Sequence, residues 1–173
     1  EALASKAPIY DRKWVRKKKS KTKIKLKNLK KIKIQDALLK ILASPNHSDK
    51  SWVTNQYDQT VMCDTAQKSG SDAAIIRIHD KDKAIAVSVD SSANYCKSHP
   101  KTGGKQIVCE NWRNLISVGA KPLAITNCLN FGNPENEIIM GEFAECLEGI
   151  KEACEFLNYP VVSGNVSFYN GTN

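Results

Sequence analysis

The sequence lacks several features that define common protein classes. None of its six cysteines forms a Cys-x-x-Cys pair, so their spacing fits no zinc knuckle. No apolar run reaches the roughly 20 residues of a membrane-spanning helix, and no secretory signal is recognisable. Because unpaired thiols are typical of a reducing compartment, these absences predict a cytoplasmic protein that does not enter a membrane. The cysteines are then expected to behave as small buried hydrophobes, with Cys128 at the end of an apolar strand.

Familiar catalytic patterns are also missing. His47, His79 and His99 stand apart from one another and from any Ser or Cys nucleophile, which favours surface residues over general bases. The phosphate-binding pattern G-x-x-x-x-G-K-[ST] is absent. A Gly-Gly-Lys tripeptide at 103–105 opens a predicted helix, where free N–H groups can hold an anion. By itself this tripeptide does not identify a phosphate site.

Positive charge is confined to the first part of the chain. Residues 1–50 carry 16 Lys or Arg against 4 acidic residues, a net charge of +12, whereas the remainder carries −4. Such a run can neutralise nucleic-acid phosphates, but no aromatic residue lies between Trp14 and Trp52 to stack on bases. A solvated linker is therefore favoured, and nucleic acid is not the expected partner. Lysines alternate with Ile24, Leu26 and Leu29, which predicts a short extended strand.

Beyond this segment the hydrophobic pattern alternates between strands and helices. An amphipathic helix is predicted at 34–43, ended by Ser-Pro-Asn. The later elements are a hairpin of strands 73–78 and 84–89, a polar loop 91–101, a helix 103–118, a strand 122–129, a helix 136–157 and a strand 160–163. This order predicts an α/β two-layer sandwich, truncated after the fourth strand. Residues 1–50 form a basic linker with a short helix, and 51–173 form the domain.

Polar loops follow three of the predicted strands, at 90–94, 127–134 and 163–167. Because ligands of open α/β sheets bind beyond the carboxyl ends of strands, the three loops could converge on one site. The alternative is that Asn-Pro and Gly-Asn are ordinary turn residues. In the last loop, Gly164 allows close approach of the backbone. The side chains of Asn165 and Ser167 can ligate a hard cation through oxygen or form a hydrogen bond to a phosphoryl oxygen.

Four sequence stretches together resemble one enzyme family, phosphoribosylformylglycinamidine synthase. They are residues 70–78, the Thr-Gly-Gly-Lys at 102–105, the stretch 120–134 with its Leu-Asn-Phe-Gly-Asn-Pro motif, and 161–167 with Ser-Gly-Asn-Val-Ser. The resemblance covers about residues 37–173. It implies an AIR-synthase-like N-terminal domain, preceded by a linker, in the second of two related halves.

The resemblance implies an ATP-dependent ligase of de novo purine biosynthesis. Such an enzyme uses ATP and Mg²⁺ to convert formylglycinamide ribonucleotide to the amidine, with ammonia delivered from a glutaminase. The expected partners are the first half of the synthase, in a pseudo-dimer formed through sheet edges, and the glutaminase subunit or domain. The family's catalytic histidine and main acidic Mg²⁺ ligands belong to the first half, so this chain alone is expected to be inactive.

Four residues match functional positions of the family. The resemblance assigns ATP contacts to Asn127 and Gly164, a Mg²⁺ ligand to Asn165 and a substrate contact to Ser167. The family often has an aspartate in place of Asn127, and an amide binds a metal ion or a ribose hydroxyl less strongly than a carboxylate. No catalytic residue is assigned.

Three other interpretations remain open at this stage. Aminoimidazole ribonucleotide synthetase, selenophosphate synthetase and thiamine-phosphate kinase share the superfamily but carry an Asp-rich Mg²⁺ motif early in this domain, where this chain has only Asp72 and Asp90. A second possibility is a non-catalytic scaffold half that holds a structural nucleotide. The third is a nucleic-acid-binding module based on the lysine run.

Overall fold

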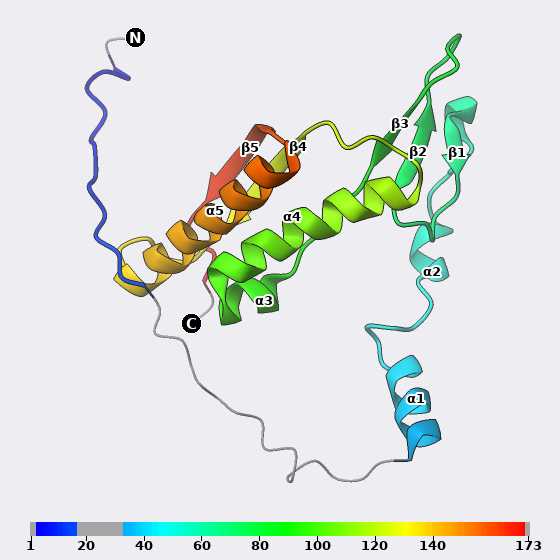
Figure 1. Cartoon of the computed structure of the whole chain (residues 1–173), viewed down its shortest axis with the longest axis horizontal. Helices are drawn as coiled ribbons and strands as arrows, with labels where there is room; N and C mark the ends of the chain where they lie inside the picture. Colours follow the sequence, from blue (N-terminus) through cyan, green and yellow to red (C-terminus); the bar gives the residue numbers. More distant parts are fainter. Residues whose placement is uncertain (1–2, 17–32, 172–173) are drawn as a thin grey trace.

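A computed structural model describes residues 3–16 and 33–171 of the chain. Two long helices, α4 (Pro100–Ser117) and α5 (Glu137–Leu157), lie side by side, with a three-stranded sheet near one end of α4 and a pair of strands along α5 (Figure 1). The fold is therefore mixed α/β, as the sequence predicted. The strands form two small sheets rather than one.

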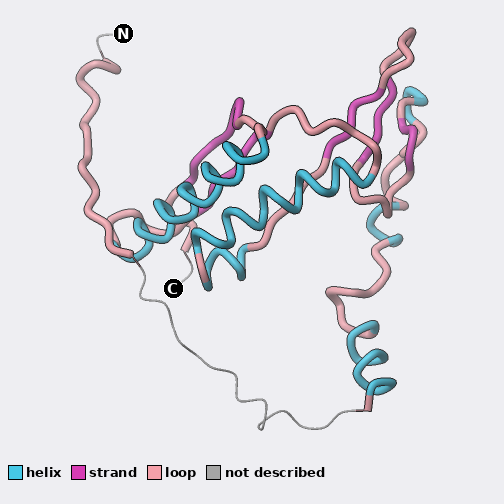
Figure 2. The backbone as a smooth tube through the Cα atoms, viewed as in Figure 1, coloured by secondary structure: helices cyan, strands magenta, loops and turns pink. Residues whose placement is uncertain are grey.

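The part before the first sheet contains short helices. Helix α1 (Ile34–Leu42) confirms the predicted amphipathic helix and ends where Ser44 Oγ donates a hydrogen bond to the Ile41 carbonyl. Helix α2 (Ser51–Thr54) and the 3-10 turn η2 (Val61–Cys63) follow (Figure 2). The strand predicted around Ile24, Leu26 and Leu29 lies outside the described residues.

The first sheet is antiparallel, in the order β1-β2-β3. Strands β2 (Ala74–Arg77) and β3 (Ala84–Val87) form the predicted hairpin, with Ile76 opposite Ile85. Strand β1 (Thr65–Gln67) was not predicted, because three polar or small residues give no hydrophobic alternation. Backbone pairing with β2, interrupted by a bulge, holds it in place.

The prediction of a loop at 91–101 is wrong, because this segment contains helix α3 (Ala93–Ser98) and the start of α4. Helix α4 begins at Pro100, a residue whose fixed φ suits the first helical position. The Gly-Gly-Lys tripeptide therefore lies inside the helix and not at its N-terminus. A Cβ atom on Gly103 would lie 2.5 Å from the Cys96 backbone nitrogen, and one on Gly104 would lie 2.5 Å from the Cys146 carbonyl oxygen. The two glycines allow close helix packing.

Helix α5 begins as predicted, with Asn136 as its N-cap; the Asn136 side chain accepts from the backbone N–H groups of Ile138 and Ile139. Strand β4 (Ile125–Asn130) precedes this helix in the sequence, and strand β5 (Val161–Ser167) follows it. The two strands pair with each other in parallel. Strand β4 begins three residues later than the predicted strand 122–129 and ends one residue later, whereas β5 extends to Ser167 instead of ending at 163. Backbone hydrogen bonds between the strands hold the polar residues in extended conformation.

A small core lies between α4 and α5. Its buried members are Ala73, Val108, Leu115, Ala153, Cys154 and Tyr159. Tyr159 is 1% exposed, and its hydroxyl donates a hydrogen bond of 2.6 Å to Asn111 Oδ1. The amide of Asn111 in turn donates to Asp90 Oδ2 at 2.8 Å. Burial raises the pKa of Tyr159, so its phenol stays a neutral donor.

We expect Tyr159→Phe to lower the free energy of unfolding by about 1 kcal/mol, because the half-buried Asn111 oxygen loses its donor. Chemical denaturation of the protein would measure the change. Tyr57→Phe is the matched control, since Tyr57 is 72% exposed. Equal stability of the two variants would contradict a role for the buried hydroxyl.

The helical pattern of 136–157 predicts a solvated face of glutamates at 142, 145, 148, 152 and 155, but several of them make ion pairs. Arg16 lies 3.8 Å from Glu145 and 2.8 Å from Glu148, and Glu152 contacts both Lys101 and Lys105 of α4. The side chain of Lys101, followed by that of Lys105, lowers the pKa of Glu152 to about 2. These charges therefore link α5 to α4 and to the N-terminal segment.

We expect Glu152 to stabilise the fold above pH 4.5, its ordinary pKa, and to lose this contribution as the pH falls towards 2. The direction follows from a carboxyl pKa that is lower in the folded state than in the unfolded state. Unfolding curves of Glu152→Gln between pH 2 and 6 should show less acid dependence than those of the wild type. Glu155→Gln, on the same helix, is the control; an equal change in both variants would contradict the assignment.

Candidate functional site

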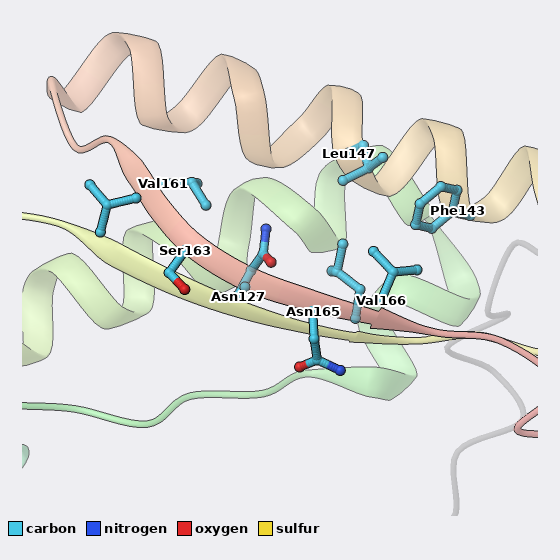
Figure 3. A pocket seen from close by; sticks show the side chains of 10 residues that line it. Asn127, Phe143, Leu147, Val161, Ser163, Asn165 and Val166 are labelled. Atoms are coloured by element: carbon cyan, nitrogen blue, oxygen red, sulfur yellow. The ribbon is translucent and has the colours of Figure 1, made fainter. Parts of the chain in front are cut away.

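The candidate site is formed by the parallel strands β4 and β5. In their register Asn127 is paired with Gly164, Cys128 with Asn165, and Asn130 with Ser167. The Asn127 side chain points towards α5 (Figure 3), and a Cβ atom on Gly164 would collide with its Oδ1 atom. The structure thus brings together the two residues predicted to contact ATP, and Asn127 explains why position 164 is a glycine.

The other two predicted site residues lie on the opposite face of the same strands. Asn165 points away from α5 in Figure 3. Its Nδ2 atom donates a hydrogen bond of 3.3 Å to Ser167 Oγ, so these two side chains are neighbours. Because side chains alternate along a strand, the pair formed by Asn127 and Gly164 and the pair formed by Asn165 and Ser167 are separated by the sheet.

The predicted loop 163–167 is part of β5, but the segments that follow β4 and β5 do meet at the carboxyl ends of these strands. The N–H of Phe131 donates to the Ser167 carbonyl at 2.9 Å, and the N–H of Asn170 donates to the Phe131 carbonyl at 3.0 Å. Phe143 of α5 contacts both loops, with its ring centroid 5.2 Å from that of Phe131 and 5.1 Å from that of Phe168, in edge-to-face geometry. This aromatic cluster fixes both loops to the helix.

The third loop makes contacts with α4 instead. Asp90 accepts hydrogen bonds from Asn111 at 2.8 Å, Asn114 at 2.6 Å and Ser88 at 2.5 Å. Both of its carboxylate oxygens are therefore engaged within the protein. Asp90 anchors the loop between β3 and α3, which is a structural role.

A groove of about 440 Å³ runs between α5 and β5 (Figure 3). Phe143 and Leu147 line its helix side, Asn127 and Leu129 come from β4, and residues 161–166 form its other wall. Its volume is within the range of small-molecule sites. In the sequence, Phe143 and Leu147 belong to the apolar stripe of the helix predicted at 136–157, and no signal distinguishes residues that line a groove from residues of the core.

The remaining predictions concern histidines and cysteines. His47, His79 and His99 are all exposed, as predicted. Cys146 and Cys154 are buried, but Cys128 is exposed, which contradicts its predicted burial. Its side chain belongs to the face of β4 that is turned away from α5. No helix among the described residues has both the length and the apolar character needed to cross a bilayer.

Comparison with known proteins identifies the domain. Residues 70–173 match the family model described as AIR synthase related protein, N-terminal domain. The chain belongs to this family. The match includes both strands of the candidate site and the two long helices, so the family resemblance expected from the sequence is confirmed.

Relatives of this AIR synthase related domain share one name. The chain is 60% identical, over 98% of its length, to a phosphoribosylformylglycinamidine synthase subunit PurL of Pelagibacter ubique. A solved structure of T. maritima PurL complexed with ADP covers 99% of the chain, with a TM-score of 0.70 and 31% identity. Another, complexed with ATP, covers 73% with a TM-score of 0.63 and 36% identity. The chain spans 23% of the P. ubique subunit, and 26% and 21% of the two T. maritima chains.

Proposed function

We propose that the chain is part of an ATP-dependent ligase that converts formylglycinamide ribonucleotide to formylglycinamidine ribonucleotide with ammonia from glutamine. The observation that carries this proposal is the 60% identity to a PurL subunit over almost the whole chain. The solved structures of T. maritima PurL complexed with ATP and with ADP support nucleotide use. Cytoplasmic purine biosynthesis is the setting that this reaction implies.

Within this function we assign residues 1–50 to a basic linker with a short helix, and 51–173 to the domain of the second half of the synthase. ATP is assigned to Asn127 and Gly164, next to the groove along α5. Among the described residues β5 has β4 as its single neighbour, so its other edge is open. A ligand at that edge could reach the backbone of Gly164 and the side chain of Asn165, although they face different sides.

Magnesium is assigned to Asn165 and the substrate to Ser167. The Asn165 amide nitrogen bonds to Ser167, which leaves its carbonyl oxygen as a hard donor. Within the described ranges, no group of three His, Cys, Asp or Glu side chains comes together. These residues therefore fit a single supporting ligand to Mg²⁺, with carboxylates supplied from the first half. Bound there, Mg²⁺ would neutralise phosphate charge during phosphoryl transfer.

The proposed partners are the first half of the synthase and a glutaminase. Apolar side chains on both small sheets are left exposed, including Ile85 and Val87 on β3 and Val161, Val162 and Val166 on β5. An open edge strand with exposed valines favours pairing with another sheet. This supports the pseudo-dimer with the first half, and the word "subunit" in the name of the relative supports a multi-component enzyme.

Formylglycinamide-ribonucleotide-dependent ATP hydrolysis by the full-length protein tests the proposal. With ammonia as nitrogen donor, we expect hydrolysis to be coupled to formation of the amidine. Omission of the ribonucleotide is the control. No substrate-dependent hydrolysis would refute the assignment, and a co-purifying nucleotide that never exchanges would favour a scaffold role for this half.

A further inference from the structure

Two cysteines lie in sulfur contact between α3 and α5. The Cys146 thiol is placed to donate to the sulfur of Cys96, with the two Sγ atoms 3.9 Å apart. Both cysteines are free thiols; Cys146 is 3% exposed, whereas Cys96 is half-buried. Solvent therefore reaches Cys96, whereas Cys146 lies behind it in the protein.

The backbones of both cysteines are fixed by the glycine pair of α4. Cys96 packs against Gly103, and Cys146 packs against Gly104; any Cβ atom at either glycine would be only 2.5 Å from the cysteine backbone. Consecutive glycines thus hold α3 and α5 against the same turn of α4. The short distance between the sulfur atoms is a consequence of this packing and not of a flexible loop.

The surroundings of the two thiols also differ. The hydrogen bond from the Cys146 thiol lowers the pKa of Cys96 to about 7, against an opposing effect of burial. The same hydrogen bond and burial raise the pKa of Cys146. Cys96, the more exposed of the two cysteines, is thus also the thiol that ionises more readily.

We propose that Cys96 and Cys146 form a peroxide-sensitive dithiol, in which Cys96 reacts first and Cys146 resolves the product as a disulfide. The Cys96 thiolate attacks one peroxide oxygen and breaks the O–O bond; with one proton taken up, this gives Cys96 sulfenic acid and water. Cys146 sulfur then attacks the Cys96 sulfur, and the released hydroxyl leaves as water with the Cys146 proton. Peroxide is reduced by two electrons, and the new bond ties α3 to α5.

Peptide mapping of the full-length protein after treatment with one equivalent of hydrogen peroxide tests this proposal. Free thiols would be blocked by alkylation before digestion at lysine, arginine and glutamate, which separates Cys146 from Cys128. We expect a Cys96–Cys146 linked peptide that a dithiol reductant removes. Complete alkylation of both cysteines after the treatment, or a sulfenic acid found at other cysteines of this chain instead, would overturn the proposal.

Two variants separate the roles of the cysteines. In Cys146→Ser, whose hydroxyl can still donate to the Cys96 sulfur but cannot form a disulfide, we expect the sulfenic acid to persist at Cys96, where dimedone traps it. In Cys96→Ser we expect no adduct at Cys146. Cys109→Ser is the matched control, because Cys109 is another half-buried thiol, on α4, and its loss should leave the linked peptide unchanged. Absence of a Cys96 adduct in folded Cys146→Ser would contradict the order of reaction.

Discussion

Gly149→Ala is expected to destabilise the protein by about 2–3 kcal/mol through overpacking of the α4–α5 interface. A Cβ atom at position 149 would collide with the backbone carbonyl of Lys101 at the start of α4. Backbone cannot rotate away as a side chain can, so the helices must separate. Alanine is normally better than glycine inside a helix by about 1 kcal/mol, and a net loss would therefore show that helix contact outweighs helix propensity.

The midpoint of urea unfolding of the full-length protein would measure this effect. Gly171→Ala is the control, because a Cβ atom there has open space within 4 Å and the backbone does not require glycine. Loss of stability in Gly149→Ala with no change in Gly171→Ala is the expected pattern. Equal or greater stability of Gly149→Ala would contradict the close approach of the two helices.

Asn165→Ala is expected to lower kcat/KM for Mg·ATP by about 10- to 100-fold in the intact enzyme, which corresponds to about 1.4–2.7 kcal/mol. The physical reason is the loss of one oxygen ligand beside the phosphates, under the proposed function. The side chain is exposed, and its hydrogen bond is to Ser167. The fold should therefore be unaffected, with an unchanged unfolding temperature.

Kinetics of formylglycinamide-ribonucleotide-dependent ATP hydrolysis over a range of Mg²⁺ concentrations would test this expectation. The Mg²⁺ concentration for half-maximal rate should rise in Asn165→Ala. Ser163→Ala is the matched control, since Ser163 lies on the same face of β5 two residues earlier. Wild-type kinetics in a folded Asn165→Ala protein would remove Asn165 from the site while leaving the proposed reaction intact.

The sequence predicted the elements whose side-chain pattern is periodic. Helices α1 and α5 and the β2–β3 hairpin lie within two residues of their predicted positions, because each presents a regular apolar face. Polar or glycine-containing segments were less predictable. Helix α3 was mistaken for a loop, and the Gly-Asn-Val-Ser end of β5 was placed outside the strand. Packing of α3 against Gly103 of α4 and pairing of β5 with β4 accompany these conformations, and side-chain periodicity shows neither contact.

In the candidate site too, the sequence identified the residues, and the tertiary structure decided how they lie relative to one another. Motifs in the sequence selected Asn127, Gly164, Asn165 and Ser167, and their assignment to ATP, Mg²⁺ and substrate stays a prediction. That Asn127 packs over Gly164, while Asn165 contacts Ser167 on the other face, depends on the parallel register of β4 and β5. The residues that set this register are more than 30 positions apart in the chain.

The sequence by itself determined the α/β character of this protein, its main helices and its membership of the AIR synthase related family, because periodicity and motifs are local properties of the chain. Only the tertiary structure decided what the glycines do. Gly103, Gly104 and Gly149 mark positions where one backbone approaches another, and Gly164 makes room for Asn127. A glycine in a sequence shows that a side chain is missing, but the atoms that fill the space come from distant segments.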